Sequence, residues 1–183
     1  MAGDELDGRI GSPRPRWVRG YGRRRVAQRP HHAPPPVGPG LAGALALGSE
    51  GVWLGTRFLA THESPLHASF KQAIVDSDGH DTVLTEIPDL ASQRVWPGAM
   101  SRAKRNGFIE RWAGREWALR RDATEVGKQV AAARAAGDVD NASLSFGQDA
   151  GLIDSIKSVK EVIQDIIAEA EEILRDRLPA LLR

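Results

Sequence analysis

A short apolar run between two glycines, directly after an Ala/Leu-rich stretch, most constrains how this chain can fold. Residues 52–54 read Val-Trp-Leu and stand between Gly51 and Gly55. A brief continuous apolar run of this kind is typical of a parallel strand buried on both faces. The preceding residues 41–47 favour a helix, and Gly48 is suited to end it. The order helix, glycine turn, buried strand is one step of an α/β fold.

The end of this run has the features of an anion site. Gly55 has no side chain, so a bulky group can approach its backbone, and Thr56 adds a hydroxyl donor beside free main-chain N–H groups. Backbone N–H groups at the start of a helix form phosphate cradles in many proteins. An ordinary turn after a buried strand is the alternative interpretation of the same residues.

Three segments resemble the nitronate monooxygenase family, formerly called 2-nitropropane dioxygenases. Residues 40–58 resemble the last strand–helix unit of that family, residues 58–65 its continuation, and residues 147–153 its C-terminal Gly-Gln loop. FMN-dependent enoyl-acyl-carrier-protein reductases share this architecture. The resemblance covers about residues 39–175. It implies an α/β fold: the C-terminal portion of a TIM-type (β/α)8 barrel, followed by a mostly helical C-terminal segment.

The resemblance also implies a cofactor and a reaction. Family members oxidise alkyl nitronates with FMN and oxygen, so we expect FMN as cofactor and a small nitronate as substrate. The residues expected to contact FMN, chiefly its phosphate, are Trp53, Leu54, Gly55 and Thr56, with Gln148 near the flavin. An FMN-dependent enoyl-thioester reductase is a second interpretation. A non-catalytic remnant, or a helical interaction module, is a third.

The upstream part of the family pattern has no counterpart in the sequence. The family has a glycine pair at the end of the preceding strand, but residues 31–40 read HHAPPPVGPG, and consecutive prolines do not form an interior strand. The histidine of the family's catalytic loop has no match either, so no catalytic residue is identified. The chain has 183 residues, whereas a complete barrel needs roughly 250. We therefore hypothesise a truncated or frame-shifted product, whose exposed barrel edge would favour self-association.

Residues 1–38 differ in composition from the remainder. No acidic residue occurs between Arg9 and Ser49, and arginines alternate with prolines up to Pro36. Few large apolar residues are present, so burial cannot offset the entropy of ordering, and we expect disorder. The expected organisation is a basic Pro/Arg-rich segment at 1–38 and a partial FMN-type barrel with C-terminal helices at 39–183. The basic segment lacks a recognised nucleic-acid-binding fold, so we do not expect nucleic acid as a partner.

Several classes of site are excluded by composition. Cysteine is absent, which excludes disulfides and thiolate sites, and no histidine–carboxylate cluster has metal-ligand spacing, so we expect no metal. No apolar run approaches the about 20 residues that span a bilayer. The start of the chain lacks the basic-then-apolar order of a signal peptide. We therefore expect a cytoplasmic protein without a membrane partner.

Further helices and strands are predicted from the spacing of apolar residues and from turn-forming residues. The patterns predict a helix over 65–75, a turn at Asp78–Gly79 and a strand over 82–87. They also predict a helical region over 108–136 that is interrupted at Gly114 and Gly127 and ended by Gly137. A last amphipathic helix begins at Ser158, which forms a capping-box pair with Glu161.

Four side chains raise separate questions. Trp96, Trp112 and Trp117 are expected to pack in the core. Arg57 follows the anion site, and two roles are open for it. It either contacts the phosphate or braces a neighbouring carboxylate.

Overall fold

The computed structural model describes residues 37–94, 96 and 98–181. The disorder expected for residues 1–36 therefore lies outside the described residues. Within these residues there are two short strands, β1 (Thr82–Thr85) and β2 (Ser101–Lys104). The helices before β2 are α1 (Val37–Ala46), α2 (Thr56–Leu59), α3 (Ala68–Val75) and α4 (Ile87–Ala91). Those after it are α5 (Gly107–Trp112), α6 (Glu116–Ala136), η2 (Gln148–Leu152), α7 (Val159–Glu172), η3 (Ile173–Arg177) and α8 (Leu178–Ala180).

The expected buried strand at residues 52–54 is wrong. This stretch forms no strand, and the side chain of Trp53 is 98% exposed. A parallel strand is held by hydrogen bonds to strands beside it. In the described part of the chain the only sheet pairs β1 with β2, antiparallel, with Thr82 opposite Lys104. Residues 52–54 therefore have no strand to pair with, and the side chains of Val52 and Trp53 are exposed to solvent.

The first core cluster forms around α3. The helix begins at Ala68, with His67 as its N-cap, so Pro65 lies before the helix rather than in its first turn. Its apolar face packs against the segment that follows α6. The buried residues of this cluster are Ala60, Phe70, Ala73, Ile74, Ala142, Leu144, Phe146, Ala150 and Ile153.

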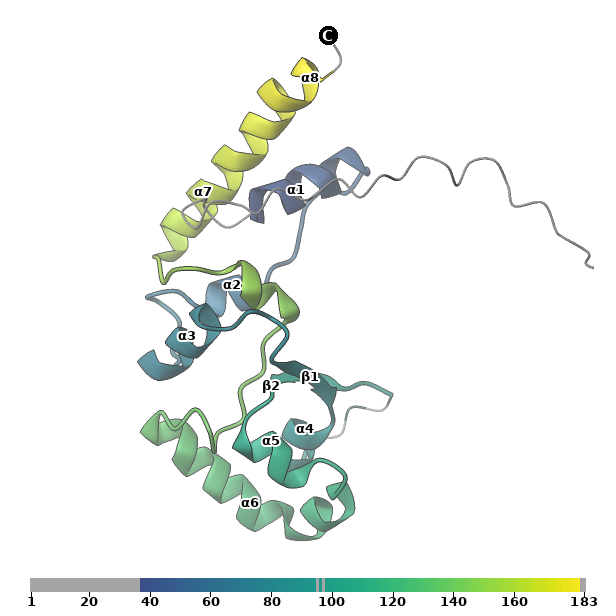
Figure 1. The fold of residues 1–183 in the computed structure, drawn as a ribbon, viewed down its shortest axis with the longest axis vertical. Helices are drawn as coiled ribbons and strands as arrows, with labels where there is room; N and C mark the ends of the chain where they lie inside the picture. Colours follow the sequence, from purple (N-terminus) through teal and green to yellow (C-terminus); the bar gives the residue numbers. More distant parts are fainter. Residues whose placement is uncertain (1–36, 95, 97, 182–183) are drawn as a thin grey trace, which may run out of the picture. The chain divides into compact units, whose positions relative to one another are not determined.

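The second core cluster lies among α4, β2, α5 and α6 (Figure 1). Gly114 separates α5 from α6 as expected, but Gly127 lies inside α6 and does not interrupt it. Close packing explains its position, because a Cβ on Gly127 would lie 2.8 Å from the carbonyl oxygen of Ala91 in α4. The buried residues of this cluster are Ile87, Ala91, Ala103, Phe108, Ile109, Leu119 and Val126.

Two of the three tryptophans expected in the core are exposed. Trp112 is half-buried and packs against the second cluster, whereas Trp96 and Trp117 are 61% and 69% exposed. Trp117 lies near the guanidinium of Arg121, whose Cζ is 5.5 Å from the ring centroid. The helical spacing of Trp117 did not show whether its side chain lies on the buried face of α6 or on the surface, where it forms a cation–π pair.

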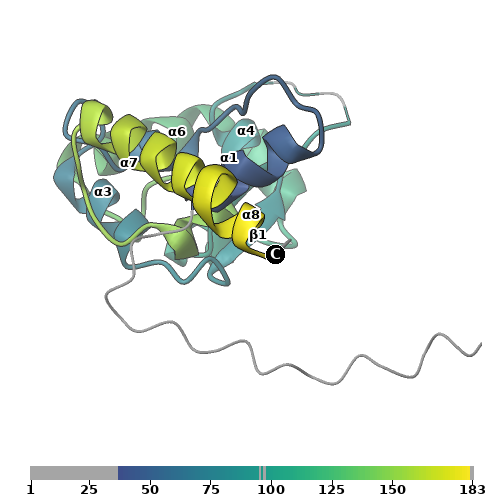
Figure 2. The same ribbon diagram turned by 90° about the horizontal axis from the view of Figure 1, so that it is seen from above.

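Helices α1 and α7 pack side by side (Figures 1 and 2). A Cβ on Gly38 would lie 2.2 Å from the Cβ of Glu169, and the Gly38 N–H donates to Glu169 Oε2 at 3.0 Å. Ala42 of α1 and Ala170 of α7 are buried. Small residues therefore bring the two helices into close contact. α1 begins at Val37, just before the boundary expected at residue 39.

The start of α7 is fixed by a capping box, as predicted from Ser158. The Ser158 side chain accepts from the Glu161 N–H, and the Glu161 carboxylate accepts from the Ser158 N–H. The carboxylate of Glu63 accepts from the Val159 N–H at 3.0 Å. The segment after α2 is thus attached to the start of α7.

Candidate functional site

The turn at Gly55 has an open, uncapped backbone. Gly55 is the N-cap of α2, and no side chain caps this helix. A Cβ on Gly55 would meet no atom within 4 Å. The first N–H groups of a helix have no partner inside the helix. The turn therefore has main-chain donors without a partner in the helix, and open space where a Gly55 side chain would lie.

Thr56 joins this turn to the Gly-Gln loop. The side chain of Thr56 is buried, and its Oγ1 accepts from the Gly147 N–H at 2.9 Å. Gly147 directly precedes η2, which begins at Gln148, an exposed residue. The structure thus brings together two segments that the sequence resemblance identified separately. Because the Thr56 hydroxyl accepts from Gly147, its own hydrogen is available to donate to a ligand.

A pair of glycines holds the Gly-Gln loop in place. Gly79 has a φ of +81°, and a Cβ on it would lie 2.2 Å from the Gln148 carbonyl oxygen. A Cβ on Gly151 would lie 2.3 Å from the Asp78 carbonyl oxygen. The turn at residues 78–79 therefore packs directly against the backbone of η2. The sequence indicated the Asp78–Gly79 turn but not its contact with the loop.

Arg57 is buried and bound to a main-chain carbonyl rather than exposed beside the turn. Its side chain is 4% exposed, and Nη1 donates to the Ser155 carbonyl oxygen at 2.9 Å. Burial lowers the pKa of Arg57, while the charges of Asp154 and Asp165 act to raise it. The sequence left two roles open for Arg57. Its hydrogen bond is to a main-chain carbonyl, and the charges of Asp154 and Asp165 that act on it agree with the second role, a contact with neighbouring carboxylates.

Trp53 and Leu54 lie before the turn without the strand context expected for them. Trp53 is almost fully exposed, and Leu54 is half-buried. The structure brings Thr56 and the Gly147–Gln148 loop together, but it does not bury Trp53 against them. Sequence reasoning missed Ser155 and the Gly147 N–H as partners of the turn, because main-chain groups have no signature in the residue types.

The residues present fit the phosphate end of FMN. The fit rests on the uncapped turn, the open space at Gly55 and the spare hydroxyl hydrogen of Thr56. Among the described residues no cluster of histidines and carboxylates is placed to hold a metal ion. Within the same part of the chain, no helix combines the length and apolar character needed to cross a membrane.

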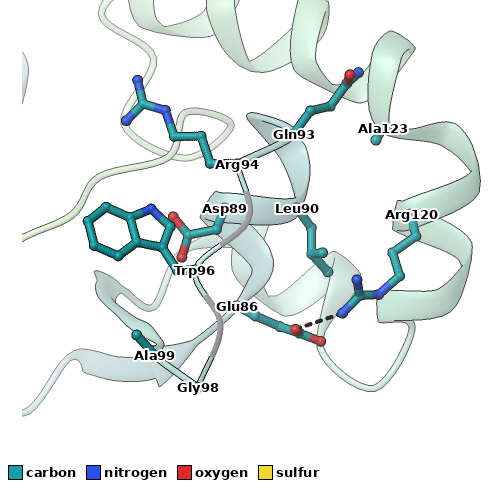
Figure 3. Close-up of a pocket in the computed structure, with 10 residues that line it drawn as sticks. All are labelled: Glu86, Asp89, Leu90, Gln93, Arg94, Trp96, Gly98, Ala99, Arg120 and Ala123. Carbon is teal, nitrogen blue, oxygen red and sulfur yellow. Dashed lines mark hydrogen bonds and ion pairs between the residues drawn. The ribbon is translucent and has the colours of Figure 1, made fainter.

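A separate cavity of about 480 Å³ lies between α4, α6 and the segment before β2 (Figure 3). Its carboxylates already have partners. Glu86 pairs with Arg120 at 2.8 Å, and Asp89 accepts from the Ser101 hydroxyl at 2.7 Å. None of its described lining residues belongs to the turn at Gly55, so we treat the two sites as independent.

Comparison with known proteins assigns the family. A family model described as nitronate monooxygenase matches residues 37–169. The chain belongs to the nitronate monooxygenase family. The matched range includes the Gly55–Thr56 turn and the Gly147–Gln148 loop.

Individual relatives support the same assignment. FabK from Thermotoga maritima is similar in structure, with a TM-score of 0.64 and 36% identity, over 79% of this chain and 44% of that one. A probable nitronate monooxygenase of Staphylococcus haemolyticus is 36% identical over 73 residues, or 40% of this chain and 18% of the relative.

The third relative aligns over more of the chain than the probable nitronate monooxygenase does. It is the (3aS,4S,5R,7aS)-5-hydroxy-7a-methyl-1-oxo-octahydro-1H-indene-4-carboxyl-CoA dehydrogenase of Mycobacterium tuberculosis. It is 30% identical over an alignment of 165 positions, and the alignment covers 73% of this chain and 46% of the relative. The chain therefore spans less than half the length of each of these three proteins.

Proposed function

We infer that this chain supplies the FMN-phosphate site of an FMN-dependent oxidoreductase. One observation carries the proposal: within the family match, Thr56 and the Gly147 N–H meet beside an uncapped, open turn. The main-chain N–H groups of Gly55 and Thr56 and the Thr56 hydroxyl bind the phosphate. Trp53 and Leu54 approach it from the preceding segment, and Gln148 from η2. When bound, FMN accepts electrons from the substrate and passes them to an electron acceptor.

The substrate we propose first is an alkyl nitronate, with oxygen as electron acceptor. Support comes from the family match over residues 37–169 and from the similarity to a probable nitronate monooxygenase. The part this chain plays is to bind and orient the cofactor. The proposal assigns no catalytic base to this chain.

An acyl thioester is the second candidate substrate. The relative named for a CoA thioester aligns over 73% of this chain, whereas the probable nitronate monooxygenase aligns over 40%. The additional aligned length favours an FMN-dependent enoyl-thioester reductase, or a related dehydrogenase, as the alternative to nitronate oxidation.

One experiment separates these activities. The protein, supplied with FMN, is given ethylnitronate under air and, in a separate reaction, an enoyl-CoA with a reduced nicotinamide. Nitronate-dependent oxygen consumption supports the first candidate, and enoyl-dependent oxidation of the nicotinamide supports the second. A protein that binds FMN and does neither would act as a non-catalytic member of the family.

Self-association is the proposed consequence of the exposed apolar segment after α1. Leu47 and Trp53 are 90% and 98% exposed, and Val52 is 42% exposed. Exposed apolar side chains close together in sequence favour contact with another protein surface. Light scattering over a concentration series tests this proposal, which requires a mass above that of one chain.

A further inference from the structure

Among the residues that the structure describes, Arg57 is the only charged residue that is buried. Burying a charge is unfavourable unless the group is hydrogen-bonded or paired. Arginine remains charged even where burial lowers its pKa. The side chain donates to the Ser155 carbonyl oxygen at 2.9 Å and lies near the carboxylates of Asp154 and Asp165. These partners stabilise the buried charge and tie Arg57 to residues 154–155.

The contact with Ser155 is the first of a series between two chain segments. Thr61 forms a parallel bridge with Lys157, and the His62 N–H donates to the Lys157 carbonyl oxygen at 3.0 Å. Further along, the Glu63 carboxylate accepts from the Val159 N–H. Residues 57–63 therefore run beside residues 155–159, and the Arg57 guanidinium makes the contact next to the turn.

Thr56 and Arg57 hold the two ends of one segment. Thr56 accepts from the Gly147 N–H at 2.9 Å, and Arg57 donates to the Ser155 carbonyl at the same distance. Both residues belong to the first turn of α2, so the segment from 147 to 155 fixes that turn from two directions. A short helix of this kind has little stability of its own, and its orientation depends on such tertiary contacts.

We propose that Arg57 is a positioning residue for the FMN phosphate. It orients the Gly55–Thr56 turn through Ser155 and does not contact the phosphate itself. This role rests on the proposed function. It implies that FMN binding and the attachment of residues 147–159 are energetically coupled, and such coupling is reciprocal.

The test compares FMN with riboflavin, which lacks the phosphate, on the full chain. Affinities are measured for the wild type, Arg57→Met and Arg57→Lys. Arg134→Met is the matched control, because Arg134 Nη1 also donates to a main-chain carbonyl, that of Ser143 at 2.9 Å, but from α6. We expect Arg57→Met to lower the ratio of FMN to riboflavin affinity by about tenfold or more, the effect of losing a hydrogen bond to a charged group. Arg57→Lys keeps a donor, so its affinity ratio should lie between those of the wild type and Arg57→Met. The affinity ratio of Arg134→Met should match that of the wild type.

Salt concentration distinguishes positioning from attraction of the phosphate through solvent. A guanidinium that attracted the phosphate through solvent would lose much of its effect at high ionic strength. A positioning role predicts the same fold-change in low and high salt. A salt-sensitive change, or an unchanged affinity ratio in Arg57→Met, overturns the proposal while leaving FMN binding intact. A wild type that binds no FMN overturns the proposed function as well.

If Arg57→Met does not fold, amide hydrogen exchange on the wild type tests whether FMN binding is coupled to residues 147–159. FMN is expected to slow the exchange of amides in residues 147–159 in addition to those at 55–57, whereas riboflavin is not. Protection by FMN that is confined to residues 55–57 would show that the segment is not coupled to the phosphate, and the proposal would be wrong.

Discussion

The Gly147 N–H donates a hydrogen bond to Thr56 Oγ1 over 2.9 Å, although the two residues are 91 positions apart in the chain. The contact places the start of η2 beside the uncapped turn at Gly55. It is the structural basis for proposing that the turn and the loop form one phosphate site. Its energetic contribution can be measured directly.

Replacing Thr56 with valine tests this contact. The change keeps the shape of the side chain but removes the acceptor, so the Gly147 N–H loses its partner. We expect a loss of about 1 kcal/mol in the free energy of unfolding, measured by urea denaturation. The affinity for FMN should fall as well, because the hydroxyl donor is lost. Thr56→Ser is the control and should behave like the wild type; equal losses in both variants would contradict the account.

Gly79 tests how tightly the Gly-Gln loop is packed. Both Gly79 and Gly114 have positive φ, +81° and +75°, but only at Gly79 would a Cβ meet another atom, the Gln148 carbonyl oxygen. Gly114→Ala should therefore cost only the backbone strain, about 1–2 kcal/mol. Gly79→Ala should cost about 1–3 kcal/mol more, because the loop must move. Equal thermal destabilisation of the two variants would mean that the loop is not held at Gly79.

Asp81 is expected to make stability depend on pH in the acid range. Burial acts to raise its pKa, but hydrogen bonds from Lys104 and Ser77 outweigh that effect and leave the pKa lowered. In the unfolded chain the pKa of an aspartate is about 3.9. As the pH falls below that pKa, the unfolded state binds more protons at Asp81 than the folded state does. This contribution to stability is fully present above that value and is lost as the pH falls through the folded pKa.

The variant Asp81→Asn isolates this contribution. Its stability should decline less steeply than that of the wild type as the pH is lowered below about 4. Asp176→Asn, at an exposed position in η3, serves as the control for removing a carboxylate. Acid unfolding curves of the wild type and Asp81→Asn that stay parallel would contradict the assignment.

Trp53 distinguishes the fold that the sequence predicted from the fold described. A tryptophan in a buried strand would cost about 3–5 kcal/mol on truncation. At 98% exposure, Trp53→Ser should change the free energy of unfolding by less than about 0.5 kcal/mol. Chemical denaturation of the variant measures this, and a large loss would show that residues 52–54 are buried after all.

Elements specified by local chemistry were predictable from the sequence. The capping box at Ser158, the left-handed Gly137 that ends α6 and the Asp78–Gly79 turn are each determined by a few adjacent residues. The strand at residues 52–54 was not, because a parallel strand depends on neighbours from elsewhere in the fold. The same limit applies to Gly127, whose contact with α4 allows it to remain inside a helix.

The candidate site was predicted in its residue types but not in its contacts. Family resemblance singled out Thr56 and Gln148, and the structure places the turn and the loop together. The contact of Arg57 could not be deduced, because its partner is the main-chain carbonyl of Ser155. Any residue type offers such a carbonyl, so the sequence carried no signal for it.

The central claim is that the turn at Gly55 and the Gly147 loop form a binding site for the phosphate of FMN. The most direct measurement is a titration of the purified full chain with FMN and, in parallel, with riboflavin, followed by flavin absorbance and fluorescence. The account predicts saturable binding of one FMN per chain, with clearly weaker binding of riboflavin. A colourless protein that takes up neither flavin, or that binds both equally, would contradict it.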